Sequence, residues 1–157
     1  MITAHLPAGY VLGRSLTSAR YVVPAAVFGA ALPDLDLIWF YLIDDRAFHH
    51  HHYWVHIPGF WLIVGAVVLP LVRRAKPALL PAGIAFFLSI FLHICLDAIA
   101  GGIAWAWPFS DRFFTLIEVP ARFDHWVLNF ILHPVFLIEV AIWAAALTLP
   151  VGRRREA

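Results

Sequence analysis

The chain has 157 residues, of which 62% are hydrophobic and only 13% are charged, and its formal net charge is +1. Soluble domains average about 25% charged residues, and a core of this size could not bury so much apolar surface. The composition therefore predicts an integral membrane protein, with a single domain over residues 1–157. The small net charge gives no reason to expect nucleic-acid binding. Membrane lipid is the expected partner because the chain is predicted to lie in a membrane.

The N-terminal segment, residues 3–19, is weakly apolar. It is too short and too polar for a membrane span, so we expect a short interfacial or re-entrant helix there. The segment also lacks a basic stretch followed by a long apolar core, and we therefore expect no cleavable signal peptide.

Four apolar stretches approach the length of about 20 helical residues that crosses about 30 Å of hydrocarbon. They are residues 21–43, 57–72, 78–100 and 127–149. The sequence thus predicts an all-α polytopic membrane protein with four transmembrane helices. The first stretch contains Pro33, and because proline removes a helical hydrogen bond we expect a kink or an unwound turn there. Irregular backbone at this depth must be buried in protein or line a wet cavity.

Basic residues mark one side of the predicted membrane. They precede the first span, separate the second from the third and follow the fourth: Arg14, Arg20, Arg73, Arg74, Lys76, Arg153, Arg154 and Arg155. The positive-inside rule makes this side cytoplasmic, in what we expect to be a bacterial inner membrane. The two other loops, residues 44–56 and 105–126, are rich in aromatic residues and would face the periplasm.

Ionisable side chains in or beside the predicted spans are the most informative feature of the sequence. Such groups are costly in hydrocarbon, and those present are usually paired, metal-bound or functional. They are Asp34 and Asp36 in the first span, His51 and His56 in the first outer loop, and His93 and Asp97 near the outer end of the third span. The predicted topology brings all six to one depth, on the periplasmic side.

The spacing of these residues is typical of metal ligands. His93 and Asp97 are four residues apart, so they share one helix face and can bind one ion, or one can orient the other. Asp34 and Asp36 are close carboxylates that repel unless a cation lies between them or one is protonated. His5 adds a further ligand if the N-terminal segment begins on the outer side.

Mixed histidine and aspartate ligands suit zinc, manganese or iron(II). Seven candidate ligands exceed one tetrahedral site, so we expect two or more ions, with zinc as the first choice. A metal pair lowers the pKa of a bridging water, which can then attack a substrate. We expect Asp34 and Asp36 to take part in catalysis, with Asp45 as the candidate general base.

Two ionisable residues in the fourth predicted span carry weaker predictions. Glu139 lies well inside it, where we expect an Arg or His partner from another span. His133 is more typical of a hydrogen-bonded core residue. Together they keep a second hypothesis open, a metal-ion or proton transport protein, which needs ionisable groups along the whole membrane depth. A third hypothesis is a structural protein with a closed metal site.

The pattern resembles the membrane-bound metal-dependent hydrolase family, whose members are associated with the inner membrane. The shared blocks are T-x-H at Thr3–His5, LPD-[IL]-D at Leu32–Asp36, H-x4-H at His51–His56 and H-x3-D at His93–Asp97, followed by the aromatic WPF of residues 107–109. The resemblance covers most of the chain and implies that these blocks hold the metal ions of a hydrolase.

The second histidine block departs from the family pattern. The family has Arg-Gly after the first histidine, where this chain has His52 and Tyr53, and Thr before the second, where this chain has Val55. The loop resembles a shorter branch that reads D-x-R-x-x-H-H-H-H. The five-residue spacing to His56 favours His51 as the ligand, with His50 and His52 as alternatives.

The family is similar in turn to the all-helical zinc phospholipase C and single-strand nuclease group. That distant similarity implies hydrolysis of a phosphoester. A site that opens at the membrane surface favours a lipid or lipid-linked substrate, and a small-molecule substrate stays open. We therefore expect a membrane-bound, metal-dependent hydrolase.

Overall fold

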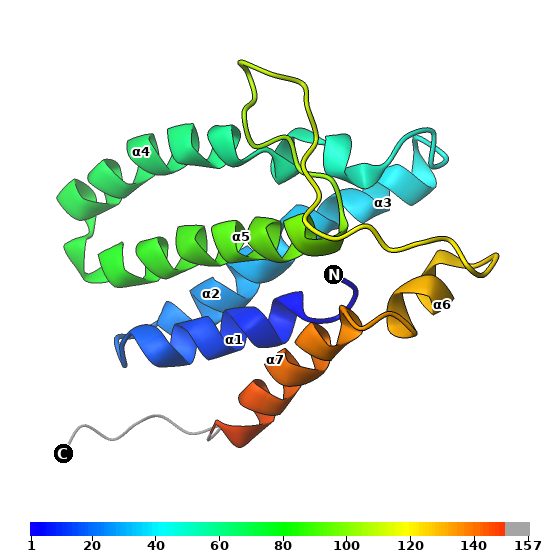
Figure 1. Cartoon of the computed structure of the whole chain (residues 1–157). Coiled ribbons are helices and arrows are strands. Elements are labelled where there is room, and N and C mark those ends of the chain that lie inside the picture. Colours follow the sequence, from blue (N-terminus) through cyan, green and yellow to red (C-terminus); the bar gives the residue numbers. More distant parts are fainter. Residues whose placement is uncertain (150–157) are drawn as a thin grey trace.

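The computed structural model describes residues 1–149, which are all-helical apart from loops and one isolated antiparallel bridge between Ile103 and Phe114 (Figure 1). The α-helices are α1 His5–Leu16, α2 Val22–Ala31, α3 Asp36–Leu42, α4 Pro58–Ala75, α5 Leu80–Ala100, α6 Trp126–Ile131 and α7 Phe136–Thr148. The short 3-10 helices are η1 Pro33–Leu35, η2 His50–His52, η3 Trp54–His56 and η4 Pro77–Leu79. The all-α prediction is confirmed. The predicted basic cluster Arg153–Arg155 lies outside the described residues.

Helix α2 packs between α1 and α5, and small residues allow the close approach. A Cβ on Gly9 of α1 would lie 2.6 Å from the Cβ of Ala30 on α2, so only glycine fits this crossing. Small residues at helix crossings are the usual route to tight packing in membranes, where lipid is as apolar as the side chains. The N-terminal helix therefore packs into the bundle, and it also contacts α7.

Helices α4 and α5 form an antiparallel hairpin around the main apolar cluster. Its buried residues are Trp61, Phe87, Ile90, Ile94 and Ile103. On the outer face of α4, large apolar side chains such as Leu62 and Ile63 are more than 60% exposed. A water-exposed surface of this kind is unfavourable, whereas hydrocarbon tails would cover it at no cost.

Two helical segments are long and apolar enough to cross a membrane, Pro58–Ala75 and Pro77–Ala100. A third candidate is the pair Val22–Ala31 and Pro33–Leu42, which is bent by 45° at the break expected beside Pro33. Proline cannot donate the next helical hydrogen bond, so α2 ends and a 3-10 turn starts there. The break places two carboxylates, Asp34 and Asp36, on irregular backbone.

The prediction of a fourth continuous span over residues 127–149 is wrong. The chain breaks between α6 and α7 at residues 132–135, where Pro134 interrupts the helix and the ring Nδ1 of His133 accepts the N–H of Val135 at 3.2 Å. The 13 residues of α7 span about 20 Å, short of a bilayer core. The described chain thus has two to three candidate spans rather than four.

The two ends of the bundle differ in chemistry. The start of α1 and the ends of α2 and α5 meet at one end, beside the turns η2 and η3 (Figure 1). The α1–α2 and α4–α5 turns lie at the other end. The latter carry the basic residues, because Arg14 is in the last turn of α1 and Arg73 and Arg74 are in the last turn of α4.

Candidate metal centre

Histidine and aspartate side chains from six elements converge at the end of the bundle remote from the basic residues. They are His5 at the start of α1, Asp34 in η1, Asp36 at the start of α3, His50 and His51 in η2, His56 in η3, and His93 and Asp97 in α5. The side chains of Asp34 and His50 are 30% and 20% exposed, and the other six are at most 6% exposed. The cluster is therefore buried with one more accessible edge.

The carboxylate of Asp97 occupies the middle of this cluster. Its Oδ1 lies 3.1 Å from Nε2 of His5. Its Oδ2 lies 2.9 Å from Nε2 of His93, 3.5 Å from Nε2 of His51 and 3.6 Å from Nε2 of His56. Oδ1 thus faces one imidazole and the N-terminal amino group of Met1, at 2.6 Å, whereas Oδ2 faces three imidazoles.

The cluster contains four sets of possible metal ligands, and within each set the ligand atoms lie within 4.8 Å of one another. We call His5, Asp34, His93 and Asp97 the helix group, and His51, His56 and Asp97 the turn group. The remaining sets are Asp34, His50 and His56, and the more exposed His49, His50 and His51. Because Asp97 belongs to both the helix group and the turn group, the two sets adjoin.

Backbone carbonyls orient two of the histidines. Nδ1 of His93 lies 2.7 Å from the carbonyl oxygen of Ala30, and Nδ1 of His51 lies 3.2 Å from that of Gly102. A carbonyl oxygen only accepts, so Nδ1 carries the proton in each neutral ring. The Nε2 lone pair is then directed at Asp97. Metal-binding histidines are usually held in this way.

Asp36 contacts the outer nitrogens of the turn histidines. Its carboxylate lies 3.0 Å from Nδ1 of His56 and 3.5 Å from Nδ1 of His50. Asp36 is not a member of the four sets of converging atoms. Its position fits a carboxylate that orients His56 through Nδ1 and leaves Nε2 free for an ion.

Many buried polar atoms of the cluster have no partner in hydrogen-bonding geometry within residues 1–149. They are both ring nitrogens of His5 and of His56, Nδ1 of His50, Nε2 of His93, both oxygens of Asp36 and Oδ2 of Asp97. Each unsatisfied buried group costs about 1–3 kcal/mol. Imidazole nitrogens and carboxylate oxygens are also the donors that zinc takes. The residues present therefore fit a divalent transition-metal ion.

Burial keeps His51 in the form that binds metals. Its removal from water lowers the pKa of His51 to about 2, although the Asp97 carboxylate opposes that shift. Burial also lowers the pKa of His5. Neutral imidazole is the metal-binding form, so neither ring must lose a proton at pH 7 before it binds an ion.

The absence of a side chain at Gly101 makes room for His51. A Cβ at that position would lie 2.5 Å from Cε1 and 2.9 Å from Nδ1 of the His51 ring. The ring would have to leave its place beside Gly102 and Asp97. Gly101 is thus a site residue that sequence reasoning missed, although the Gly-Gly pair just after α5 signals a close approach of backbone.

Several predicted residues lie away from the cluster. Asp45 is exposed and has left-handed backbone, with φ 44°, in the turn that follows α3. His52 is exposed and stacks on Phe113 with ring centroids 4.3 Å apart. His133 is half-buried in the α6–α7 break. The structure thus brings His50 and His51 to the cluster, but not His52, His133 or the proposed base Asp45.

Glu139 of α7 holds the N-terminal strap, residues 1–4. Its fully buried carboxylate accepts the backbone N–H groups of Ile2 and Thr3 and, at 2.8 Å, the hydroxyl of Thr3. Trp143 donates its indole N–H to the same hydroxyl at 3.0 Å. The prediction of an Arg or His partner for Glu139 is therefore wrong, because backbone N–H groups and a hydroxyl donate to its carboxylate instead. The strap ends one residue before His5.

The chain matches the YdjM inner membrane protein family over residues 1–152 and belongs to that family. No curated protein and no solved structure is detectably similar to it. The family and the apolar helices establish a membrane protein. They assign no reaction, so the chemistry must be argued from the buried histidine and aspartate cluster.

Proposed function

We propose that this member of the YdjM inner membrane protein family is a metal-dependent hydrolase that cleaves a phosphoester bond in a lipid or lipid-linked substrate. The observation that carries the proposal is the set of buried imidazole nitrogens and carboxylate oxygens that meet around Asp97, where they contact one another without good hydrogen-bond geometry. A structural core would have satisfied these atoms with hydrogen bonds.

The helix group and the turn group would each hold one divalent ion, and Asp97 belongs to both groups. Bound cations of this kind lower the pKa of a water and stabilise the developing oxyanion of a displacement. Zinc is the first choice of metal because the ligands are imidazoles and carboxylates in small numbers. Manganese and iron(II) accept the same donors.

The protein's own residues supply orientation, dryness and a proton acceptor. Ala30 and Gly102 fix the rings of His93 and His51, and Asp36 orients His56. Ile90 and Ile94 on α5 are fully buried in the apolar cluster with Trp61 and Phe87. Asp34 is the most exposed carboxylate of the cluster, so it is the group placed to accept a proton from an attacking water.

A lipid substrate is supported by where the cluster lies. It is at one end of the candidate spans, and the basic residues Arg14, Arg73 and Arg74 lie at the other end (Figure 1). By the positive-inside rule the cluster end faces the periplasm. The headgroup of a lipid in the outer leaflet would reach this depth with its phosphate. The distant similarity to the zinc phospholipase C and single-strand nuclease group supports a phosphoester substrate.

A transport pathway is less well supported. Ionisable residues in the span Pro77–Ala100 are confined to its last two turns, at His93 and Asp97, and the rest of that segment is uncharged. A pathway needs such groups along the whole depth. A purely structural metal site predicts a closed set of ligands, whereas Asp34 is 30% exposed and leaves one edge open.

The test is hydrolysis of a panel of phosphoesters by the full-length protein in lipid nanodiscs, with soluble aryl phosphates beside phospholipids and polyisoprenyl phosphates. We expect turnover of at least one lipid member, loss with a chelator and recovery with zinc or manganese. Asp34→Asn should abolish turnover, and Asp124→Asn, an exposed loop residue, should not. Equal turnover by wild type and Asp34→Asn, or turnover that resists chelation, would contradict the proposal.

A further inference from the structure

We propose that His49, His50 and His51 form an entry site, which captures a divalent transition-metal ion from solution and passes it to the buried cluster. The inference rests on the proposed function, because it needs a metal centre to supply. His49 is its new member, since that residue contributes to neither the helix group nor the turn group.

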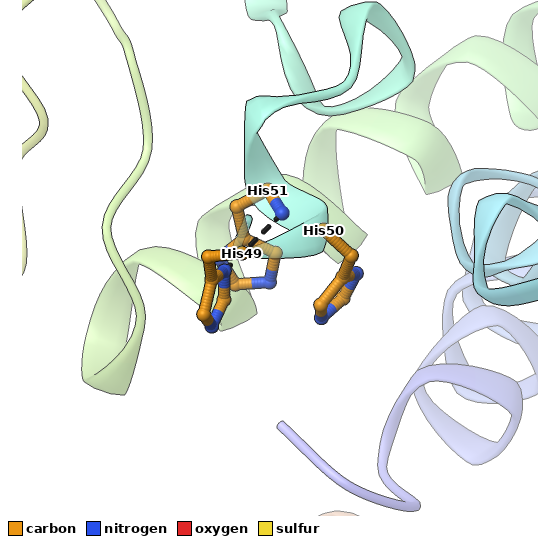
Figure 2. Close-up of side chains that lie close together, drawn as sticks. All are labelled: His49, His50 and His51. Carbon is orange, nitrogen blue, oxygen red and sulfur yellow. Dashed lines mark hydrogen bonds between the residues drawn. The ribbon is translucent and has the colours of Figure 1, made fainter. Parts of the chain in front are cut away.

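The three rings project from one short turn and lie close together (Figure 2). Ring centroids are 4.5 Å apart for His49 and His51, 4.3 Å for His50 and His51, and 5.0 Å for His49 and His50. The nitrogen atoms that can act as ligands lie within 4.8 Å of one another. Zinc–nitrogen bonds of about 2.0–2.1 Å bring two nitrogens to within about 4.2 Å, so a small rotation of the rings completes the site.

The entry site runs from solvent to the interior. His49 is exposed, His50 is intermediate and His51 is buried. The Nδ1 atom of His49 accepts the backbone N–H of His51 at 3.2 Å, which is the dashed line in Figure 2. This hydrogen bond holds the His49 ring beside the turn, and in the neutral ring the proton then lies on Nε2. The Nδ1 lone pair is therefore the one that an ion would take, in place of the N–H of His51. An ion can therefore meet His49 first and His51 last.

Two of the three histidines also belong to sets that include a buried residue of the cluster and an aspartate, which we call the inner sets. This shared membership makes a transfer possible. His51 joins His56 and Asp97 in the turn group, and His50 joins another inner set with His56. Nδ1 of His51 is engaged by Gly102, so only Nε2 is left to bind an ion. One lone pair serves one ion at a time, and His51 must therefore release an outer ion when it takes an inner one.

Charge gives the transfer its direction. The entry site offers three imidazoles and no carboxylate, so it does not neutralise a divalent ion. The inner sets add Asp34 and Asp97, and Asp36 lies against the outer nitrogens of His50 and His56. A cation is thus drawn towards the interior. Three imidazoles select zinc, copper or nickel over magnesium and calcium, which prefer oxygen ligands.

The test is the rate of zinc uptake by metal-free, full-length protein in nanodiscs, followed by stopped flow with a zinc-sensitive dye as competitor. His49→Ala and His49→Gln should both slow uptake by about tenfold, because they remove the capture step that raises the local ion concentration. The final zinc content should be unchanged. His52→Ala is the matched control in the same loop, since His52 faces Phe113, and it should load at the wild-type rate.

The three readings of this experiment are distinct. Wild-type uptake rates in both His49 variants would overturn the entry site and leave the hydrolase proposal standing. Lower final zinc content in those variants, at an unchanged rate, would also overturn it, because His49 would then be a permanent ligand. A wild-type protein that takes up no zinc would overturn the entry site together with the proposed function.

Discussion

The helix group and the turn group share Asp97 but are built in different ways. In the helix group, His93 and Asp97 stand on successive turns of the long helix α5, and His5 stacks on His93 with ring centroids 3.7 Å apart. In the turn group, His51 and His56 come from two single-turn 3-10 helices. One half is held by packed helices, and the other by hydrogen bonds from a loop.

This difference predicts unequal metal binding. Ligands on packed helices are already in position, whereas short 3-10 turns belong to the less stable parts of a fold and gain order when they bind. The free-energy cost of ordering η2 and η3 therefore weakens the binding of the ion in the turn group. We therefore expect the helix group to bind its ion more tightly than the turn group.

The largest effect is expected for Asp97→Asn, because both groups use this carboxylate. Asparagine keeps the shape and removes the charge, so both ions should be lost and the affinity should fall by more than the roughly 10–100-fold typical of a change beside a ligand. Elemental analysis after dialysis measures the loss, and circular dichroism checks the fold. Retention of both ions by Asp97→Asn would contradict the assignment of Asp97 as a ligand shared by both groups.

Single-ligand changes should separate the two halves. His93→Ala removes a helix-group ligand and should lose the tighter ion, while His56→Ala should lose only the weaker one. Zinc titration calorimetry of metal-free protein should show two classes of site in the wild type and one in each variant. Loss of the same class in both variants would show that the halves form one inseparable site.

A smaller effect is expected at the strap held by Glu139. Thr3→Val removes the hydroxyl that joins Glu139 to Trp143, so His5 should be less well positioned and the helix-group affinity should fall by about tenfold. Thr3→Ser keeps the hydroxyl and should restore binding. The turn-group affinity should not change in either variant. Equal losses in both classes of site would point to general destabilisation instead.

The smallest effect concerns pH and the metal-free protein. The pKa of His51 is about 2 in the folded chain, because of burial, and about 6.5 when unfolded. Below pH 6.5 the unfolded chain therefore binds a proton that the folded chain does not. The free energy of unfolding thus decreases as the pH is lowered, by at most about 1.4 kcal/mol per pH unit. Thermal melts between pH 7.5 and 5.5 should show a shallower decline for His51→Asn. Parallel declines would contradict this assignment.

Local spacing predicted the helix-held part of the cluster. The i, i+4 relation of His93 and Asp97 places both on one face of α5, and the proline beside Asp34 and Asp36 marks the break between α2 and α3. These features depend on residues near each other in the chain. The structure brings these predicted residues together at one end of the bundle.

Long-range contacts could not be predicted in the same way. Glu139 meets Thr3 across most of the chain, and apolar periodicity cannot show which backbone donors reach a buried carboxylate. The division of the histidine run, with His51 inward and His52 against Phe113, depends on how η2 docks on the end of α5. Hydropathy alone predicted a continuous fourth span because it counts apolar residues and does not register the interruption at Pro134.

The most direct test of the metal centre is the metal content of the purified, tag-free protein, measured by elemental analysis after exhaustive dialysis against metal-free buffer. We expect about two transition-metal ions per chain, most simply zinc, one for the helix group and one for the turn group. A protein that retains no stoichiometric metal, and binds none when zinc is added back, would contradict it.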